Sequence, residues 1–301
     1  MFDETFHAFD RKLSLRWQRA GNIDRLLVAH VTDSHVLSGA ERCVGVVEDF
    51  PSPTWGRDRL ADVVRELRSF QKTPDLLVLG GDMTQTGHAA EWDMVFETLA
   101  PVKVPVLVTL GNQEHRNNVV GSTAFESSIA SLHARGFKDG QVKDRWAFSE
   151  KIGGYRFVGL DSLHCGTLGA GQHEFLRSEL ANGDATILVV HRPTVCTGHF
   201  VDERRLIDPT FETILRDYPN VAAVVCGHAH RHCTQRQEGR LHLVTPAVNF
   251  GNHDRTGYRL FCLANGKVSW STTRFPAGLS CHSFRGSAVE QAGGALWEEF
   301  P

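Results

Sequence analysis

The sequence predicts an α/β fold with largely parallel strand pairing at its centre. Short apolar, β-branched runs recur along the chain, and each has the length of a strand that is buried on both faces. Segments with helical periodicity separate most of these runs, an alternation that is typical of parallel sheets. Toward the end strand follows strand, which indicates an antiparallel addition or a second sheet.

The predicted strands share their apolar, β-branched composition. They lie at 26–32 (LLVAHVT), 76–80 (LLVLG), 104–110 (VPVLVTL), 155–160 (YRFVGL), 186–191 (TILVVH) and 221–226 (VAAVVC). The predicted helices repeat apolar residues at helical intervals. They lie at 57–70, 89–100, 122–136, 171–181 and 208–218. The later strands, predicted at 240–245, 256–263 and 267–275, follow one another without a helix, and a turn-like Ala-Asn-Gly joins the last two.

The chain of 301 residues predicts one catalytic domain, 25–275, with an extension at each end. The N-terminal extension, 1–24, is predicted to be helical, because apolar residues recur in it at helical intervals: Phe2, Phe6, Phe9, Leu13 and Trp17. Such a stripe covers the protein's own core, a second copy or another partner, so homo-oligomer formation stays open. The stretch 276–301 is rich in Gly, Ser and Ala and is predicted to be a C-terminal tail.

Composition excludes several classes of protein. The formal net charge of -3 leaves no excess of Lys and Arg for an extended nucleic acid, although a small anionic substrate remains compatible with it. The seven cysteines form no CxxC pair and are odd in number, which argues against a disulfide framework. No apolar run has the length of a membrane span or of a signal-peptide core. We therefore expect a cytoplasmic protein without a membrane span.

Polar clusters follow five of the predicted strands directly. They are Asp33-Ser34-His35, Gly80-Gly81-Asp82, Gly111-Asn112, His191-Arg192-Pro193 and Gly227-His228-Ala229-His230. Ligands of open α/β sheets bind at the carboxyl ends of strands, where such loops converge. Two carboxylates, one Asn and four imidazoles form a mixed oxygen and nitrogen set that suits Mn, Fe or Zn. Seven ligands are too many for one tetrahedral ion, so the sequence predicts two ions with a shared carboxylate such as Asp82.

The order DSH, GGD, GN, H and GHAH resembles that of the calcineurin-like metallophosphoesterase superfamily, over roughly residues 26–245. The segments LGGDMTQTG, YRFVGLDS and HRPTVCTG resemble those of bacterial cyclic-nucleotide and glycerophosphodiester phosphodiesterases. The resemblance implies a four-layer αββα sandwich, in which two mixed sheets pack face to face with helices outside. It also implies that a metal-bridging hydroxide is the nucleophile.

The resemblance further implies how the ligands are divided between the two ions. Asp33, His35 and His230 would hold the first ion, and Asp82 would bridge. The second ion would be held by Asn112, His191 and His228.

Gln113 departs from the family pattern, because many members have His after the Asn. That His contacts the phosphate and can protonate the leaving group, whereas a neutral amide donates a hydrogen bond but has no proton to give up near neutral pH. Loss of a general acid costs about 10²- to 10⁴-fold in rate, while loss of the metals would remove the nucleophile. The substitution therefore predicts a changed enzyme rather than a dead one.

The source of the leaving-group proton is accordingly open. The substrate could carry a good leaving group, solvent could supply the proton, or another residue could do so. His115 is the nearest candidate in sequence, and His199 and His253 are others. Arg192 lies beside a predicted ligand and could contact either a substrate phosphate or a neighbouring carboxylate.

These observations predict a dinuclear, metal-dependent hydrolase of phosphodiesters. We expect catalytic roles for Asp82, Asn112, Gln113 and His115, and substrate contacts from Asn112, Gln113 and Arg192. One alternative is a pyrophosphohydrolase acting on a nucleotide-linked substrate, whose phosphate leaving group needs no strong acid, and a phosphomonoesterase is another. The alternative from a different class is a catalytically inactive scaffold that retains the fold.

Overall fold

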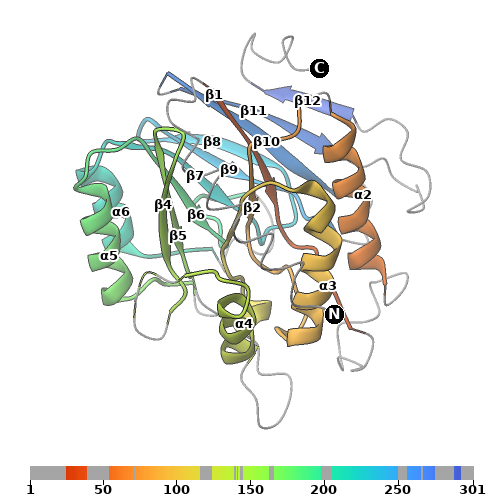
Figure 1. Ribbon diagram of the computed structural model, residues 1–301. Coiled ribbons are helices and arrows are strands. Elements are labelled where there is room, and N and C mark those ends of the chain that lie inside the picture. Colours follow the sequence, from red (N-terminus) through yellow and green to blue (C-terminus); the bar gives the residue numbers. More distant parts are fainter. Residues whose placement is uncertain are drawn as a thin grey trace.

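The computed structural model describes residues 25–38, 54–70, 72–115, 124–138, 140, 142, 145–162, 166–197, 205–249, 256–265, 267–274 and 288–292. Two six-stranded sheets pack face to face, and helices cover their outer faces (Figure 1). Both sheets mix parallel and antiparallel pairs. The predicted four-layer αββα sandwich is confirmed.

The first sheet contains the beginning and the end of the described chain. Its strand order is β12-β11-β10-β1-β2-β3. The bounds of its strands are β1 Arg25–Val31, β2 Leu76–Leu79, β3 Val106–Val108, β10 Gly257–Ala264, β11 Lys267–Arg274 and β12 Ala288–Ala292. β1, β2 and β3 run parallel, while β10 pairs antiparallel with β1. β12 comes from the predicted tail and pairs antiparallel with β11.

The second sheet has a parallel centre and antiparallel edges. Its strand order is β4-β5-β6-β7-β9-β8. The bounds of its strands are β4 Phe148–Ile152, β5 Tyr155–Leu160, β6 Thr186–Val190, β7 Val221–Cys226, β8 Cys233–Gln237 and β9 Arg240–Val244. β5, β6, β7 and β9 pair in parallel, whereas β4 and β8 pair antiparallel with their neighbours. Parallel pairs therefore form the centre of the second sheet and one half of the first, β1-β2-β3, where helices alternate with strands in the sequence.

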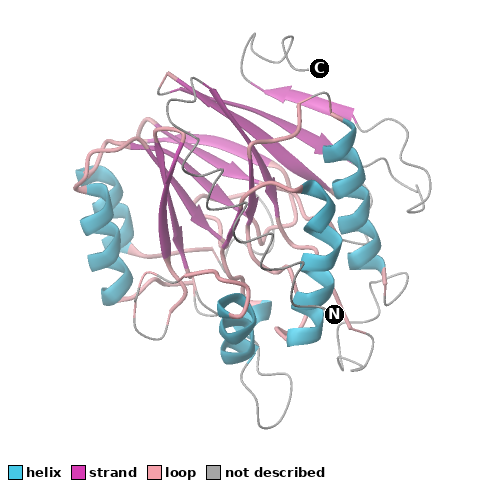
Figure 2. Ribbon diagram, viewed as in Figure 1, coloured by secondary structure: helices cyan, strands magenta, loops and turns pink. Residues whose placement is uncertain are grey.

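The helices form the two outer layers, seen as cyan ribbons on either side of the magenta strands in Figure 2. Their bounds are α2 Trp55–Ser69, α3 Ala89–Leu99, α4 Ala124–His133, α5 Ala170–Leu180 and α6 Pro209–Asp217, with the short 3-10 turns η2 Ala100–Val102 and η3 Gln113–His115. Alternate side chains of a strand point to opposite faces. Leu27 of β1 accordingly packs in the core under α2 and α3, and Leu26 packs in the core between the sheets. A third core lies between the second sheet and α5 and α6.

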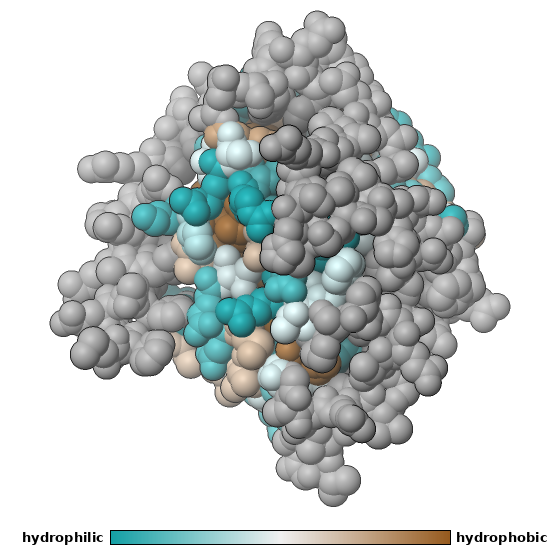
Figure 3. Space-filling view, turned by 90° about the vertical axis from the view of Figure 1, so that its right-hand side faces the viewer, coloured by the Kyte–Doolittle hydropathy of each residue, from teal (hydrophilic) through white to brown (hydrophobic). Residues whose placement is uncertain are grey.

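The apolar side chains of the described residues are almost all enclosed by these cores. Ile207 is the exposed large hydrophobic residue among them. On the face shown in Figure 3, the visible described residues are mostly hydrophilic, with small apolar areas. Within the described part of the chain, no helix is long and apolar enough to cross a bilayer.

Candidate metal centre

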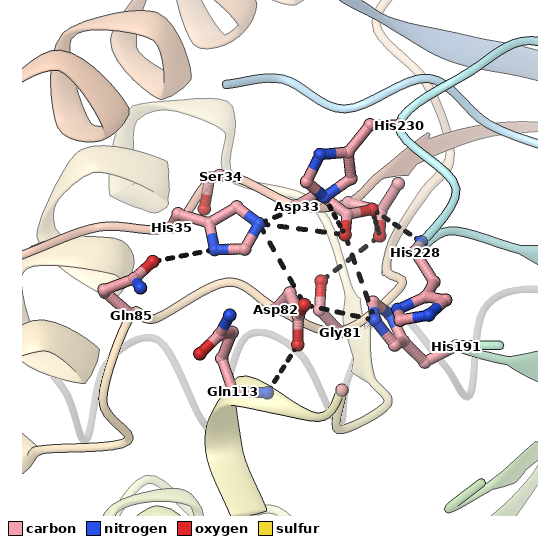
Figure 4. A network of polar contacts seen from close by, with 12 residues as sticks. Asp33, Ser34, His35, Gly81, Asp82, Gln85, Gln113, His191, His228 and His230 are labelled. Carbon is pink, nitrogen blue, oxygen red and sulfur yellow. Dashed lines mark hydrogen bonds and ion pairs between the residues drawn. The ribbon is translucent and has the colours of Figure 1, made fainter. Parts of the chain in front are cut away.

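The predicted ligand residues come from loops at the carboxyl ends of parallel strands. Asp33 and His35 follow β1, and Asp82 follows β2. From the second sheet, His191 follows β6, and His228 and His230 follow β7. Figure 4 shows these side chains pointing toward one another. Strand order thus brings together residues that are far apart in sequence.

The six side chains form two groups of three. The first group is Asp33, His35 and His230, and the second group is Asp82, His191 and His228. Within each group, the atoms that could bind a metal lie within 4.8 Å of one another. Each group takes side chains from both sheets.

Asp82, a member of the second group, also faces the first group. Its Oδ2 is 3.3 Å from Nε2 of His191 and 4.0 Å from Nε2 of His35. Asp33 Oδ1 likewise lies 3.2 Å from Nε2 of His230 and 3.9 Å from Nε2 of His191. A carboxylate at the junction of two such groups has the position of a bridging ligand.

Five of these six residues have a positive backbone φ. The angles are 57° at Asp33, 47° at His35, 49° at Asp82, 64° at His228 and 48° at His230. The left-handed conformation costs an L-residue roughly 1 to 2 kcal/mol. Such strain gathers at functional sites, where the surrounding structure holds it in place. The strained loops turn the side chains sharply toward one point, which is direct structural support for a functional centre.

Neighbouring polar groups orient the potential ligands. Nδ1 of His191 donates to the carbonyl oxygen of Gly80 at 2.8 Å, so its Nε2 is directed at Asp82. Nδ1 of His35 is bound to Oε1 of Gln85 at 2.9 Å, which leaves its Nε2 facing Nε2 of His230 at 3.3 Å. Two neutral imidazole nitrogens that approach in this way repel each other unless a proton or a cation lies between them. Partners on the far ring nitrogen are typical of metal-ligating His.

Asn112 Oδ1 is buried without a hydrogen-bond partner among the described residues, and Asp33 Oδ1 is buried with Nε2 of His230 at 3.2 Å. Asp33 Oδ2 is occupied, because it accepts hydrogen bonds from Thr32 Oγ1 (2.7 Å) and from the His228 backbone N–H (3.0 Å). Burying a polar atom without a partner is costly. Both oxygens are therefore suited to bind a cation.

The charges of the centre also favour a cation. Burial opposes ionisation of Asp33, but His230 and His191 outweigh it and lower the pKa of Asp33 to about 2. Burial opposes protonation of His191, but Asp82 and Asp33 outweigh it and raise its pKa to about 9. Burial, reinforced by His191 and Arg192, lowers the pKa of His228 to about 3. The ionised carboxylates thus attract positive charge, which the His191 proton supplies here and which a metal ion would supply on displacing that proton, and the donor set fits two divalent cations.

Gln113 and His115 lie in η3, next to Asn112. The Gln113 backbone N–H donates to Asp82 Oδ1 at 2.7 Å, and the side chain is buried beside Asp82 (Figure 4). His115 Nε2 lies 2.8 Å from Asp161 Oδ1, and its ring stacks on Phe125 with a centroid distance of 4.8 Å. The structure thus gives His115 a carboxylate partner that its sequence position does not reveal.

Arg192 is buried, and its Nη1 lies 3.2 Å from Nε2 of His228. This contact joins Arg192 to an imidazole of the second group, and the two alternatives for Arg192, a substrate phosphate or a neighbouring carboxylate, stay predictions. The other candidate proton donors, His199 and His253, lie outside the described residues.

Sequence reasoning missed the residues that hold the ligand loops together. Glu114 is fully buried, and burial together with the Asp82 charge raises its pKa to about 7. Gln85 orients His35, and Asp161 binds His115. Their only sequence feature is that they are polar residues in loops at strand ends. Many loop residues share this feature without binding a ligand loop.

A model of the calcineurin-like phosphoesterase family matches residues 26–232. The chain belongs to this family. Among curated proteins it is similar to a probable cyclic nucleotide phosphodiesterase of Synechococcus sp., 26% identical over 239 residues that cover 76% of this chain and 83% of the relative. It is also similar to the 3',5'-cyclic adenosine monophosphate phosphodiesterase CpdA of Escherichia coli K12, 25% identical over 240 residues that cover 76% of this chain and 79% of that protein.

A solved structure supports the fold of this calcineurin-like phosphoesterase. A dimetal phosphatase from Danio rerio superposes with a TM-score of 0.61 at 14% identity, covering 88% of this chain and 98% of that one. The predicted resemblance to bacterial cyclic-nucleotide phosphodiesterases is confirmed by the curated relatives. As a calcineurin-like phosphoesterase with two groups of ligating side chains, the chain is a metal-dependent phosphoric ester hydrolase with a dinuclear centre.

Proposed function

We propose that this phosphoesterase hydrolyses phosphodiesters and that its substrate is a cyclic nucleotide. The observation that carries the proposal is the pair of three-residue groups, which adjoin at Asp82 and whose backbone is held in a strained conformation. The names of the similar curated proteins support the choice of a cyclic diester.

The proposed ligands follow the two groups. Asp33, His35 and His230 hold one ion, Asp82 is shared, and the second ion takes the remaining ligands, His191, His228 and Asn112. Mn, Fe and Zn all suit this mixture of donors. When bound, two such ions lower the pKa of a shared water, orient the phosphate and stabilise the charge of in-line displacement.

The remaining polar residues of the site bind and orient the phosphate in this proposal. Gln113 presents its amide beside Asp82, Asn112 precedes it in the chain, and an amide N–H donates to a phosphoryl oxygen. Arg192 lies against His228 of the second group, where its positive charge favours an anionic substrate. None of these residues needs to change its ionisation during the reaction.

The leaving group of a cyclic nucleotide is a sugar alkoxide, which needs a proton. We assign this role to His115, whose Nε2 is bound to Asp161 at 2.8 Å. The His115 backbone N–H donates to the Asn112 carbonyl oxygen at 3.3 Å, so the imidazole is carried by the same turn as a proposed ligand. A buried carboxylate fixes the orientation of the ring, as in other catalytic His–Asp pairs.

A pyrophosphohydrolase is the second candidate, and Gln113 is the observation that favours it. An enzyme without the usual His at this position is suited to a phosphate leaving group. The nature of the preferred substrate therefore distinguishes the two functions.

The test is a substrate comparison with purified chain loaded with Mn²⁺. Cyclic AMP, cyclic GMP, bis-p-nitrophenyl phosphate, p-nitrophenyl phosphate and a nucleotide-diphospho compound are assayed side by side. We expect metal-dependent turnover of the diesters that disappears in Asp82→Ala. Preference for the diphospho compound would favour the pyrophosphohydrolase, and a chain that retains no metal and hydrolyses none of the substrates would indicate a scaffold.

A further inference from the structure

Glu114 lies at the centre of the loops that carry the proposed ligands. Its side chain is fully buried, and both carboxylate oxygens are used. Oε2 accepts hydrogen bonds from the backbone N–H groups of Asp82 (2.9 Å) and Gly111 (2.8 Å). Oε1 accepts from the backbone N–H and the hydroxyl of Thr84, both at 2.9 Å. One side chain thus joins the loop after β2 to the loop after β3.

The loop after β1 is attached to the same unit. The backbone N–H of Asp33 donates to the Gly81 carbonyl oxygen, and that of His35 donates to the Asp82 carbonyl oxygen, both at 3.0 Å. Displacing the backbone at Asp82 would therefore displace His35 as well. Glu114 consequently acts on members of both proposed metal groups.

The loops after β2 and β3 are in close contact, so the geometry at Glu114 has little freedom. A Cβ placed on Gly111 would lie 2.2 Å from Asp82 Oδ1 and 2.4 Å from the Asp82 backbone N. Asp82 itself has a φ of 49°. A strained residue keeps such a conformation only where its surroundings determine it, and the hydrogen bond from Asp82 N–H to Glu114 is one of those determinants.

A carboxylate is the group that this arrangement requires. Four donors point at its two oxygens, and a carboxylate, whose two oxygens are both acceptors, can accept from all four. Gln at this position must direct its NH₂ group at one of the two donor pairs, and at least one backbone N–H then loses its acceptor.

We propose that Glu114 is a positioning residue for the metal centre, which sets the affinity for the ions by holding Asp82 and His35 at their ligand positions. This inference rests on the proposed function. Residues that orient metal ligands from outside the coordination shell typically change metal affinity about 10- to 100-fold when replaced. Glu114 never contacts the substrate in this proposal.

The chain offers a matched control in Asp208. Asp208 is also a buried carboxylate with four donors, namely Thr210 N–H, Phe211 N–H, Leu168 N–H and His173 Nε2. These donors belong to α5, α6 and the residues that precede them, and none is a proposed ligand. Replacing Asp208 removes a comparable set of hydrogen bonds from the helical layer of the second sheet.

The experiment compares wild type, Glu114→Gln and Asp208→Asn. Isothermal titration calorimetry measures the affinity for Mn²⁺. The electron paramagnetic resonance spectrum of bound Mn²⁺ and the Tm of the metal-free protein are measured as well. We expect Glu114→Gln to bind Mn²⁺ about 10- to 100-fold more weakly and to change the spectrum. Asp208→Asn should lower the Tm and leave Mn²⁺ binding unchanged. Wild-type Mn²⁺ affinity and spectrum in folded Glu114→Gln would overturn the inference.

If Glu114→Gln does not fold, Thr84→Val tests the role of Glu114 instead. This variant removes the hydroxyl donor to Glu114 Oε1 and keeps the shape of the Thr84 side chain. Weaker Mn²⁺ binding by this variant supports the inference, and wild-type binding overturns it. A wild-type chain that binds no Mn²⁺ refutes the proposed function. A wild-type chain that binds and uses Mn²⁺, alongside unimpaired Glu114 and Thr84 variants, refutes the role of Glu114 alone.

Discussion

The two sheets contribute different chemistry to the metal centre. The first sheet carries all the proposed oxygen ligands, Asp33, Asp82 and Asn112, together with His35. The second sheet carries only imidazoles, which are His191, His228 and His230. Negative charge therefore comes from one half of the sandwich and imidazole nitrogen donors from the other. Neither half holds a complete group, so the centre exists only while the sheets are packed together.

The largest expected effect is the difference in turnover and bound Mn²⁺ between a variant of the first sheet, Asp82→Ala, and a variant of the second sheet, His191→Ala. Asp82→Ala removes the carboxylate between both groups, and we expect turnover to fall to background and Mn²⁺ binding to drop below two ions per chain. His191→Ala removes a ligand of the second group alone and should retain one ion. Metal analysis after desalting, together with turnover of bis-p-nitrophenyl phosphate, checks both. Undiminished turnover by Asp82→Ala would refute the site.

His115 should matter mainly for substrates with poor leaving groups. We expect His115→Ala to lower cyclic nucleotide turnover by about 10²- to 10⁴-fold, which is the usual contribution of a general acid. Bis-p-nitrophenyl phosphate has a good leaving group and should be hydrolysed at a nearly unchanged rate. Steady-state kinetics on both substrates measures the difference.

The second sheet supplies the control for His115. His173 is bound to Asp208 at 2.8 Å, the same separation as His115 from Asp161, but it lies in the helical layer. His173→Ala should slow neither substrate. Adding Gln113→His to His115→Ala should restore part of the cyclic nucleotide turnover, and an equal loss on both substrates in His115→Ala would argue against a proton donor.

Metal removal should lower the thermal stability of the chain, because the proposed ions link the two sheets. Because each group spans both sheets, an ion binds the folded chain and not the unfolded one. At a free concentration about 100-fold above Kd, such binding adds about 2.7 kcal/mol of stability and raises Tm by roughly 5 to 10 °C. Calorimetry with excess Mn²⁺ and with a chelator measures this shift, which His230→Ala should reduce. An equal Tm under both conditions would contradict ligation across the sheets.

A smaller effect is expected from acid at His242 of the second sheet. Burial, with a contribution from Arg240, lowers its pKa from 6.5 to about 4, and its Nδ1 is bound to Thr194 Oγ1. As the pH falls, His242 therefore takes up a proton in the unfolded chain at a higher pH than in the folded chain. This histidine leaves stability unaffected above pH 6.5 and decreases the free energy of unfolding by about 2 kcal/mol at pH 5.

His242→Gln tests that assignment, because Gln keeps a polar partner for Thr194 and does not titrate. Denaturant unfolding at pH 8 and pH 5 should show a smaller loss of stability in the variant than in wild type. The same loss in both proteins would mean that other groups cause the acid sensitivity.

The sequence predicted the buried parts of the fold better than its edges. β1, β2, β6 and β7 are continuous apolar runs because both of their faces are covered. β4 and β8 went unpredicted, since these half-exposed edge strands, FSEKI and CTQRQ, have no such run. β3 is shorter than its apolar stretch.

The candidate site was predictable as a set of residues but not as a set of contacts. The polar clusters follow apolar strands, so their convergence could be inferred from strand direction. Three contacts show this: Gln85 binds His35, Asp161 binds His115 and Glu114 binds Asp82. The paired residues are 50, 46 and 32 positions apart in the sequence, respectively. A single sequence carries no local signal for such pairings.

The positive φ angles at the proposed ligands create a conflict between stability and function. Glycine adopts this conformation without the penalty that Asp or His incurs. A chain selected only for stability would therefore replace Asp33, His35, Asp82, His228 or His230 by Gly, and each replacement would remove a metal ligand. The metal centre thus occupies five of the eight described non-glycine positions with a positive φ, where the backbone would gain from losing its side chain.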